Sequence, residues 1–402
     1  MLRANKRRHG QTGTGTKPGA RMTLKNLLGA EKTSEEQIDK IAYSSDASQI
    51  RGQTEIIAWP ETAEEVRRTV KYCLEQGMNI VPRGGGTGLA GGAVPNNSVV
   101  IDLSKMNKIE IKGDYATVEP GVVLEDLNTK TEKFLPVVPG SRKSATIGGM
   151  IATNAAGMRS IKYGKMLNWI EELEVIDGNG NKTTVGKDKI KDFCGREGTT
   201  GIITKAKIRL AEKPKELSLS ILTFENITNL AEKLKELVKN KNVSAIEYLD
   251  KITSALAGLE DRPHLIVEYE SYEGNIKGQD MEEVWEMRDG IYALVVNEGY
   301  AVIEDPEIKI ENIDKFLYWL QKNDIPTYGH IGIGVLHPHF RKDSPLIAEM
   351  FETTKTLDGK VSGEHGIGIL KKEYAEKEIV DEIKKLKKTY DEKNIMNKGK
   401  II

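Results

Sequence analysis

Two histidines that could ligate a metal ion, His330 and His337, lie seven residues apart and are separated by two glycines. On an unbroken strand an odd separation would place the two imidazoles on opposite faces. The glycines allow a bend or bulge that brings both rings to one side. The pair alone favours an ordinary structural role, but Glu364 adds a carboxylate. Two histidines and one carboxylate are a common set for a catalytic divalent ion with open coordination positions, so these residues indicate a metal site.

A second group of residues suited to chemistry is rich in glycine. Residues 82–95 read PRGGGTGLAGGAVP, with six glycines among fourteen residues, and residues 146–157 read TIGGMIATNAAG. Glycine at this density lets the backbone adopt φ > 0 and turns successive N–H groups toward an anion with no side chain between them. An isolated run of this kind is usually a surface loop. Two such runs beside predicted secondary structure indicate a cradle for a diphosphate.

The elements before the first glycine run position it at the end of a strand. A helix is predicted over 63–76, because Thr62 and Glu65 form a capping-box pattern at its start and a glycine follows its end. The apolar residues 79–82 then read as a short strand. The glycines therefore follow directly on a helix and a strand.

The same region excludes a familiar nucleotide site. Gly86, Gly88 and Gly91 match the pattern GxGxxG. A Rossmann site needs a helix immediately after these glycines, whereas residues 99–103 read as another strand. We therefore reject a Rossmann dinucleotide site.

Composition narrows the class of protein. The chain has 402 residues, enough for two or three domains, with 59 basic and 60 acidic residues. This balance gives no reason to expect nucleic acid or an anionic membrane surface as the main partner, and no apolar run is long enough to cross a bilayer. Cys73 and Cys194 are the only cysteines and form no CxxC pair, so the chain cannot build an iron–sulfur cluster or zinc finger from its thiols. A disulfide is not expected, and the cytoplasm is the default compartment.

The pattern along the chain predicts two α+β domains. Residues 1–21 are basic, polar and rich in glycine, which predicts a disordered arm and leaves open whether translation starts at Met1 or Met22. Further expected elements, which alternate in both domains, are strands over 116–119, 173–176, 201–210, 217–224, 245–249 and 265–269, and helices over 230–238, 281–296, 313–322 and 371–390.

Several segments resemble a known flavoprotein family in their sequence motifs and in the order and spacing of these motifs. The N-terminal half resembles the FAD-binding domain of the vanillyl-alcohol-oxidase type in residues 43–48 (YSSDAS), 82–92 (PRGGGTGLAGG), 118–121 (VEPG), 139–141 (PGS), 146–157 (TIGGMIATNAAG) and 195–204 (GREGTTGIIT). In the C-terminal half, SGEHGIG at 362–368 and LKKEY at 370–374 resemble the D-2-hydroxy-acid dehydrogenase branch. That branch includes glycolate oxidase FAD subunits, D-lactate dehydrogenases and D-2-hydroxyglutarate dehydrogenases.

The resemblance implies an α+β fold with a two-part FAD-binding domain. It places this domain at 22–212, an α+β substrate (cap) domain with the metal site at 213–370, and a C-terminal helical segment that packs back on the FAD domain at 371–402. It also implies that FAD is held without a covalent bond, because the glycine loop has no histidine. The residues it implies for FAD are Arg83, Gly84, Gly85, Gly86, Thr87, Gly88, Leu89, Gly91, Gly92, Pro139, Gly140, Ser141, Ser144, Thr146, Gly148, Gly149, Ala152, Thr153, Asn154, Gly157, Tyr163, Glu197, Gly198 and Ile203.

The family pattern also implies roles for the chemistry-bearing residues. His330, His337 and Glu364 would bind zinc, manganese or iron, and His365 would be the catalytic base, a role that suits an imidazole near neutral pH. Arg288 would clamp the substrate carboxylate, although an ion pair on the surface of its helix is an equal alternative. The remaining histidines, which carry no clear signal, are His339, read as a spare ligand or loop residue, and His264 and His9, read as structural or exposed.

The chain departs from the family pattern at Ile333 and Val335, where an aspartate and an asparagine usually stand beside the metal and flavin. Lys309 likewise replaces a usual proline. These changes remove polar support near the metal, so reduced or lost activity stays an open alternative.

Together these features predict oxidation of a small D-2-hydroxy acid, glycolate or D-lactate, with FAD and a divalent ion. Electrons would pass to a separate acceptor: an iron–sulfur protein, a quinone or an electron-transfer flavoprotein. Alternatives are a D-2-hydroxyglutarate-type dehydrogenase, a subunit that holds FAD for assembly or electron relay, and, last, a transferase similar to alkyl-dihydroxyacetone-phosphate synthase. A homodimer and attachment to a membrane through a partner are left open.

Overall fold

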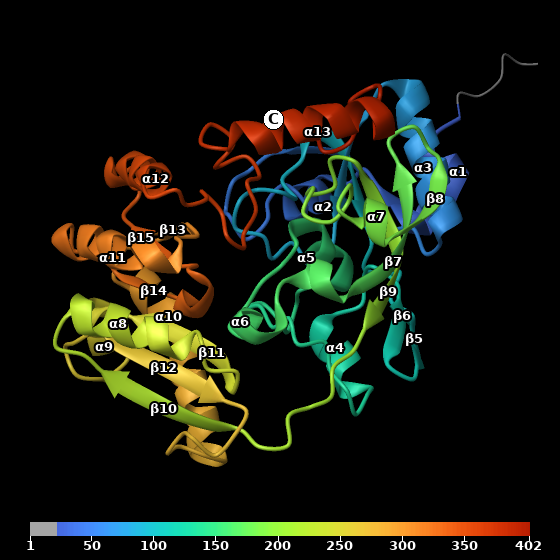
Figure 1. Cartoon of the computed structure of the whole chain (residues 1–402). Helices are drawn as coiled ribbons and strands as arrows, with labels where there is room; N and C mark the ends of the chain where they lie inside the picture. The colour runs from blue at the N-terminus through green and yellow to red at the C-terminus, as the bar shows by residue number, and fades with distance from the viewer. Residues whose placement is uncertain (1–21) are drawn as a thin grey trace, which may run out of the picture.

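A computed structural model of the chain describes residues 22–402 (Figure 1). The predicted disordered arm, the choice of start codon and His9 lie outside these residues. Within them the strands form three sheets, and helices alternate with strands throughout. The predicted α+β class is confirmed. No helix of the described part has the length and apolar character that crossing a membrane requires.

The first sheet carries the glycine loop. Its strand order is β1-β2-β4-β3, with β2, β4 and β3 parallel. Helix α3 follows the sequence prediction at both ends, because the Thr62 hydroxyl accepts a hydrogen bond from the Glu65 N–H and Gly77 adopts a left-handed φ of 66°. The elements of this part are α1 (Leu24–Leu28), η1 (Ala30–Lys32), β1 (Thr33–Ser34), α2 (Gln37–Ala42), β2 (Gln53–Ala58), α3 (Ala63–Gln76), β3 (Asn79–Arg83) and β4 (Asn96–Asp102).

A second, antiparallel sheet has the order β5-β6-β9-β7-β8. Its inner face and the short helices that follow the second glycine run share one apolar core. Both free cysteines are buried, Cys194 in this core and Cys73 beneath the first sheet. The elements are β5 (Ile109–Lys112), β6 (Tyr115–Val118), α4 (Leu124–Thr129), α5 (Ile147–Thr153), α6 (Ser160–Tyr163), η2 (Met166–Trp169), β7 (Ile170–Asp177), β8 (Lys182–Gly186), α7 (Lys187–Ile190) and β9 (Gly201–Arg209).

The third sheet forms a separate lobe in the yellow-to-orange part of Figure 1. Its strand order is β10-β12-β11-β14-β15-β13, and β11 and β12 are buried along their whole length. The elements are β10 (Ser218–Thr223), α8 (Ile227–Leu237), β11 (Val243–Leu249), α9 (Lys251–Leu256), β12 (His264–Tyr269), α10 (Gln279–Asn297), β13 (Val302–Ile303), η3 (Ile310–Asn312), α11 (Ile313–Lys322), β14 (Thr327–Gly329), η4 (Ile331–Ile333), β15 (His337–Phe340) and α12 (Leu346–Thr356). We call this lobe the cap.

The C-terminal segment returns to the first sheet. Helix α13 (Lys377–Tyr390) lies across the top of the molecule in Figure 1, and it begins six residues after the predicted start at 371. Beyond it, Met396 pairs in parallel with Ile80 of β3, with the Ile80 N–H donating to the Ile395 carbonyl at 2.8 Å and the Asn397 N–H donating to the Ile80 carbonyl at 2.8 Å. The last residues of the chain therefore extend the edge of the sheet that carries the glycine loop.

Candidate active site

The glycine loop after β3 presents a run of unused backbone donors. The N–H groups of residues 84–92 donate no hydrogen bond to any residue that the structure describes. Backbone donors that lie unpaired beside a groove usually find a partner in a ligand or in water. A row of nine such groups fits a bound anion, as the sequence predicts.

The second glycine run packs directly against this loop. The sequence predicted no secondary structure for it. Instead it forms helix α5, with the Thr146 hydroxyl capping the Gly149 N–H. A Cβ atom at Gly84 would lie 2.2 Å from Thr146 Oγ1, and one at Gly85 would lie 2.1 Å from the Ser144 carbonyl oxygen. Glycine is thus required where the two segments meet, because a side chain there would force them apart.

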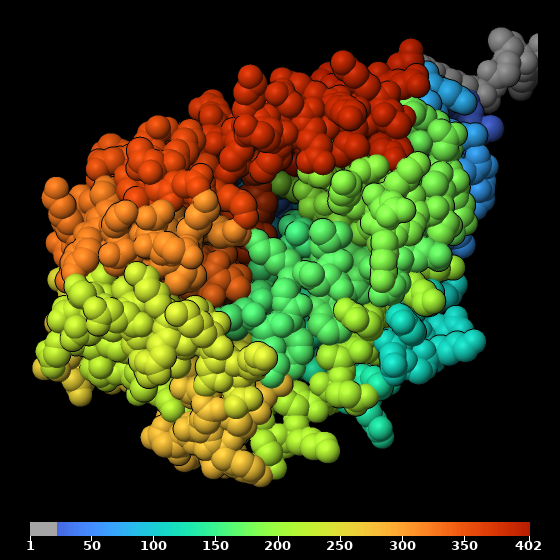
Figure 2. All heavy atoms as spheres, in the orientation of Figure 1, coloured from blue at the N-terminus to red at the C-terminus, as the bar shows by residue number. Residues whose placement is uncertain are grey.

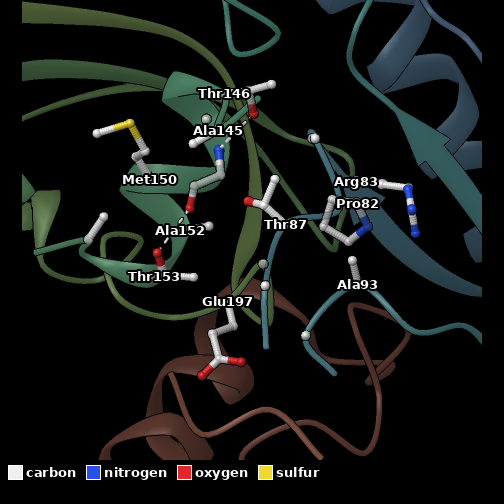
Figure 3. Close-up of a pocket in the computed structure, with 18 of the residues that line it drawn as sticks. Pro82, Arg83, Thr87, Ala93, Ala145, Thr146, Met150, Ala152, Thr153 and Glu197 are labelled. Carbon is white, nitrogen blue, oxygen red and sulfur yellow. Dashed lines mark hydrogen bonds between the residues drawn. The ribbon is translucent and has the colours of Figure 1, made fainter. Parts of the chain in front are cut away.

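A cleft runs between the two glycine segments and contains about 1190 Å³ of free space, part of it open to solvent. Figure 3 shows Thr87, Thr146 and Thr153 on neighbouring walls, with Glu197 at the lower end. The predicted FAD residues that line the cleft are Arg83, Gly84, Gly85, Gly86, Thr87, Gly88, Leu89, Gly92, Pro139, Ser141, Thr146, Gly148, Gly149, Ala152, Thr153, Glu197, Gly198 and Ile203.

Some predicted FAD residues lie outside this lining and have other contacts. Tyr163 donates to Glu270 of the cap, and Asn154 ends helix α5 and accepts the Leu167 N–H at 2.9 Å. The others outside the lining are Gly91, Gly140, Ser144 and Gly157. The sequence analysis did not predict the other lining residues, most of them apolar, which come from strand ends, from α5 and its flanks and from the turn after α7. They are Pro82, Ala93, Leu103, Pro120, Ala145, Met150, Ala155, Phe193, Gly201 and Ile202.

The cleft ends at Glu364 and His365, which also belong to its lining. The diphosphate cradle and the candidate base thus share one cavity although they lie far apart in the sequence. In Figure 2 the surface is hollowed where the C-terminal residues, coloured orange to red, meet the green residues of the FAD-binding part.

The three candidate metal ligands come together as expected. His330 Nε2 lies 3.4 Å and His337 Nε2 lies 3.7 Å from Glu364 Oε2, and one ligand atom of each residue lies within 4.8 Å of the others. The chain bends between the histidines at η4, where Gly334 has φ 74° and a Cβ would lie 1.9 Å from the Ile308 carbonyl oxygen. The predicted glycine bend is therefore confirmed, and a larger residue at 334 would break it.

The donor set fits a divalent ion. Glu364 Oε2 is buried and has no hydrogen-bond partner in the described chain. Burial lowers the pKa of His337 well below its usual value, so this imidazole stays neutral and keeps a lone pair. Burial raises the pKa of Glu364, but His330 beside it reverses the shift and brings the value to about 2, which keeps the carboxylate ionised. Two imidazoles and an ionised carboxylate are suitable ligands for zinc, manganese or iron.

Glu247 on β11 supports the candidate metal site through its contact with His330, and the sequence analysis did not identify it. Its fully buried carboxylate accepts from His330 Nδ1 at 2.6 Å and from Arg288 Nε at 2.7 Å. Burial alone would raise the pKa of Glu247, but the charges of Arg288 and His330 bring it to about 2. A carboxylate bonded to the far nitrogen of a ligating histidine fixes the orientation of the ring.

Arg288 is neither exposed nor free. It is buried on α10, and its Nη2 lies 2.5 Å from Glu247, so the surface ion pair considered from the sequence is wrong. The guanidinium lies 4.9 Å from the centre of the Tyr328 ring. Its Nη1 has no hydrogen-bond acceptor among residues 22–402.

Replacing Glu247 with glutamine is expected to lower metal affinity by about 10–100-fold, because His330 loses its orienting carboxylate. The same change leaves Arg288 buried without a counter-charge, which destabilises the fold by about 3–5 kcal/mol. Metal titration and thermal unfolding measure the two effects. Glu268, equally buried and paired with Arg159 at 2.8 Å, provides the control, since Glu268→Gln should lower stability and leave metal affinity unchanged. Equal metal affinities of Glu247→Gln and the unaltered protein would contradict the assigned role.

Asp305 holds the loop that carries Glu364 and His365. Its Oδ2 accepts the N–H groups of Gly363, Glu364 and His365 at 3.1, 2.6 and 2.6 Å. Lys371, also buried, pairs with the same carboxylate. Burial opposes ionisation, but the Lys371 and His365 charges keep the pKa of Asp305 below its ordinary value. An ionised carboxylate in a nest of backbone donors therefore determines the conformation of the loop.

The other unassigned residues have structural settings. His339 lies on β15 and not on a loop, bonds to the Tyr300 carbonyl and stays outside the metal group. His264 bonds to Ser254 and to the Arg262 carbonyl, a structural role as expected. Val335 is buried against the loop, where a Cβ on Gly363 would lie 2.4 Å from it. The chain thus has an apolar contact where the family pattern has a polar one.

Both halves of the chain match families of known proteins. Residues 54–186 match the model of the FAD binding domain and residues 274–401 that of the FAD linked oxidases, C-terminal domain. The chain is 33% identical to glycolate oxidase subunit GlcD of Bacillus subtilis, over 94% of this chain and 95% of that protein. It is 30% identical to D-lactate dehydrogenase of Archaeoglobus fulgidus over 86% and 91%.

More distant proteins share the fold. A D-2-hydroxyglutarate dehydrogenase of Stutzerimonas stutzeri is 26% identical over 96% of this chain and 99% of that protein. A solved alkyldihydroxyacetonephosphate synthase covers 93% of this chain and 83% of its own, with a TM-score of 0.67 at 15% identity. The latter likeness concerns the fold alone.

The fold and the cleft define an FAD-dependent flavoprotein of the vanillyl-alcohol-oxidase type. The chain belongs to the FAD-linked oxidase family, in the branch of the hydroxy-acid dehydrogenases. It is therefore an oxidoreductase that acts on CH–OH groups.

Replacing Gly85 with alanine tests the cradle. The new Cβ would meet the Ser144 carbonyl oxygen at 2.1 Å, so the two glycine segments must separate. Overpacking of this kind costs about 1–3 kcal/mol, and we expect FAD affinity to fall by about tenfold or more. FAD content of the purified protein and fluorescence titration measure it. Gly186→Ala, where a Cβ meets nothing within 4 Å, should keep the flavin. Full FAD content in Gly85→Ala would show that the cradle lies elsewhere.

Proposed function

We propose that this chain oxidises a small D-2-hydroxy acid, glycolate or D-lactate, to the 2-oxo acid and passes the electrons to a separate acceptor. The observation that carries this proposal is the single cleft that extends from the glycine cradle to His365 and Glu364. A substrate at that end would contact both the flavin and the metal ligands.

Each residue of the site has a proposed role that follows from its position. His365, whose ring stacks on that of His337 at a centroid distance of 5.1 Å, would accept the proton of the substrate hydroxyl. The free Nη1 edge of Arg288 would bind the substrate carboxylate, while Glu247 keeps the guanidinium in place. His330, His337 and Glu364 would hold a divalent ion.

The two bound groups supply what these side chains lack. The amides of the glycine loop would hold FAD, which would supply a hydride acceptor, and His330, His337 and Glu364 would hold a divalent ion, which would supply a Lewis acid. The acceptor of the electrons would be a separate iron–sulfur protein, a quinone or an electron-transfer flavoprotein, since both cysteines are buried and apart.

A second candidate is a subunit that holds FAD for assembly or electron relay without oxidising a substrate. Ile333 and Val335 favour it, because both are apolar where the family pattern has polar groups, and Val335 is buried against the loop of Glu364 and His365. The intact ligand set and His365 favour the enzyme, and we therefore rank the relay subunit second.

Anaerobic reduction of the flavin separates the two candidates. Metal-analysed protein is mixed in turn with D-lactate, L-lactate, glycolate and D-2-hydroxyglutarate, and the visible flavin band is followed. Bleaching by glycolate or D-lactate but not by L-lactate supports the proposal, and bleaching only by D-2-hydroxyglutarate moves the substrate to that class. Yellow protein that none of the acids reduces favours the relay subunit.

A further inference from the structure

The loop that carries the candidate base connects the cap to the FAD cleft. Its first half bonds to Asp305 of the cap, as described above. Its second half bonds to a different carboxylate: Glu197 accepts the Ile367 N–H at 2.7 Å and the Gly368 N–H at 2.9 Å. Two carboxylates from the two lobes therefore determine the conformation of consecutive halves of one loop.

The second half of this loop also contacts the glycine loop. The N–H groups of Ile369 and Leu370 both donate to the Ala90 carbonyl, at 2.8 and 3.3 Å. Ala90 belongs to residues 84–92, whose own N–H groups are unpaired. This short segment therefore offers hydrogen-bond donors to the cleft and an acceptor to the loop that carries Glu364 and His365, which we call the metal loop. A ligand that orders residues 84–92 will therefore also order the hydrogen bonds to residues 369 and 370.

The backbone of Glu197 has a strained conformation at the point where its side chain makes these contacts. Its side chain is 8% exposed, it lines the FAD cleft, and its φ is 50°, in the left-handed region. In Figure 3 it points away from the glycine loop toward the C-terminal segment below. Gly366 completes the fit, because its φ is 83° and a Cβ there would lie 2.7 Å from Glu197 Oε1. Strain of this kind persists only where the surroundings fix the geometry.

Residues near the C-terminus also hydrogen-bond to the glycine loop, to Glu197 and to the metal loop. The Asn397 amide donates to the Gly92 carbonyl at 2.9 Å and to the Glu197 carbonyl at 2.6 Å. The Ile401 N–H donates to the Gly368 carbonyl at 2.9 Å. The glycine loop, Glu197 and the metal loop are thus bonded to one another and to a common segment.

We propose that FAD and the divalent ion bind cooperatively, and that Glu197 is the positioning residue that carries the coupling between the two sites. The proposal rests on the metal site of the proposed function. Since Glu364 is three residues from Ile367, a fixed position of Ile367 and Gly368 limits where the Glu364 carboxylate can lie. Binding at either site orders the shared loop, and by reciprocity each ligand then raises the affinity for the other by the same factor.

The test measures FAD affinity of the full-length protein at equilibrium, from the fluorescence of released FAD, with saturating Mn²⁺ and with a chelator. We expect the unaltered protein to bind FAD about fivefold or more tightly when Mn²⁺ is present, the lower end of typical coupling between sites. In Glu197→Ala the ratio should fall to about one. Glu197→Gln keeps one acceptor oxygen and should give an intermediate ratio, which serves if the alanine variant does not fold. Glu268→Gln, a buried carboxylate that does not touch the loop, should keep the ratio of the unaltered protein.

A ratio of one in the unaltered protein would overturn the inference, and so would an undiminished ratio in Glu197→Ala. Mn²⁺ binding that leaves FAD affinity unchanged contradicts the coupling alone. A protein that binds no divalent ion in either form contradicts the proposed metal site as well. The assay uses no substrate, so failure of hydroxy-acid oxidation does not affect its outcome.

Discussion

His365→Ala is expected to leave the protein yellow while slowing reduction of the flavin by a D-2-hydroxy acid by about 10²–10⁴-fold, the usual contribution of a general base. The glycine-loop amides that would hold FAD make no hydrogen bond to this side chain, so FAD content should stay unchanged. The backbone N–H of residue 365 still reaches Asp305, so the loop should keep its conformation. Stopped-flow absorbance at the flavin band under anaerobic conditions gives the rate directly.

An exposed neighbour supplies the control for this measurement. Lys372 lies on the same segment and is exposed, so Lys372→Ala should reduce the flavin at the normal rate. If His365→Ala lost FAD as well as activity, the loop would have collapsed. The rate would then report the loss of the flavin and not the role of His365 in catalysis. An unchanged rate with full FAD content would remove His365 from the catalytic role.

Glu364→Gln is expected to empty the metal site and to lower the rate of flavin reduction by about two to three orders of magnitude. The amide is a weaker ligand than the carboxylate, and loss of the Lewis acid removes several kcal/mol of stabilisation from the reaction. Elemental analysis and the same anaerobic assay measure both effects. Removal of the metal from the unaltered protein with a chelator should give the same loss, reversed when the ion is returned.

Glu373 is the matched carboxylate for this experiment. It is exposed and lies nine residues farther along the chain, and Glu373→Gln should keep both metal and activity. Full activity of a metal-free Glu364→Gln protein would mean that hydroxyl activation needs no metal ion, and the three ligands would then have only a structural role.

Local sequence patterns predicted much of the fold and the site. Helix α3 and the strand after it could be read because a capping residue, a terminal glycine and an apolar run are all local features. The meeting of His330 and His337 could be read for the same reason, since the bend depends on glycines between them. The family pattern supplied Glu364 and His365.

The supporting carboxylates could not be read in this way. Glu247 lies 83 residues before His330, and Glu197 lies 170 residues before Ile367. Nothing near Glu247 in the chain distinguishes it from the many exposed glutamates. The family pattern implied Glu197 as an FAD residue, but its bonds to Ile367 and Gly368 depend on which loops the tertiary fold brings together. Arg288 shows the same limit: periodicity placed it on a helix, and only packing decided that it is buried against Glu247.

The pairing of Met396 with Ile80 has a consequence for biosynthesis. The edge of β3 is completed by residues 395–397, which are synthesised after the whole cap. Domains usually fold in the order of their synthesis, but here the edge of the first sheet is completed only after residues 395–397 have been made. A stop codon or a fusion partner within the last few residues would thus affect the nascent glycine loop, more than three hundred positions upstream.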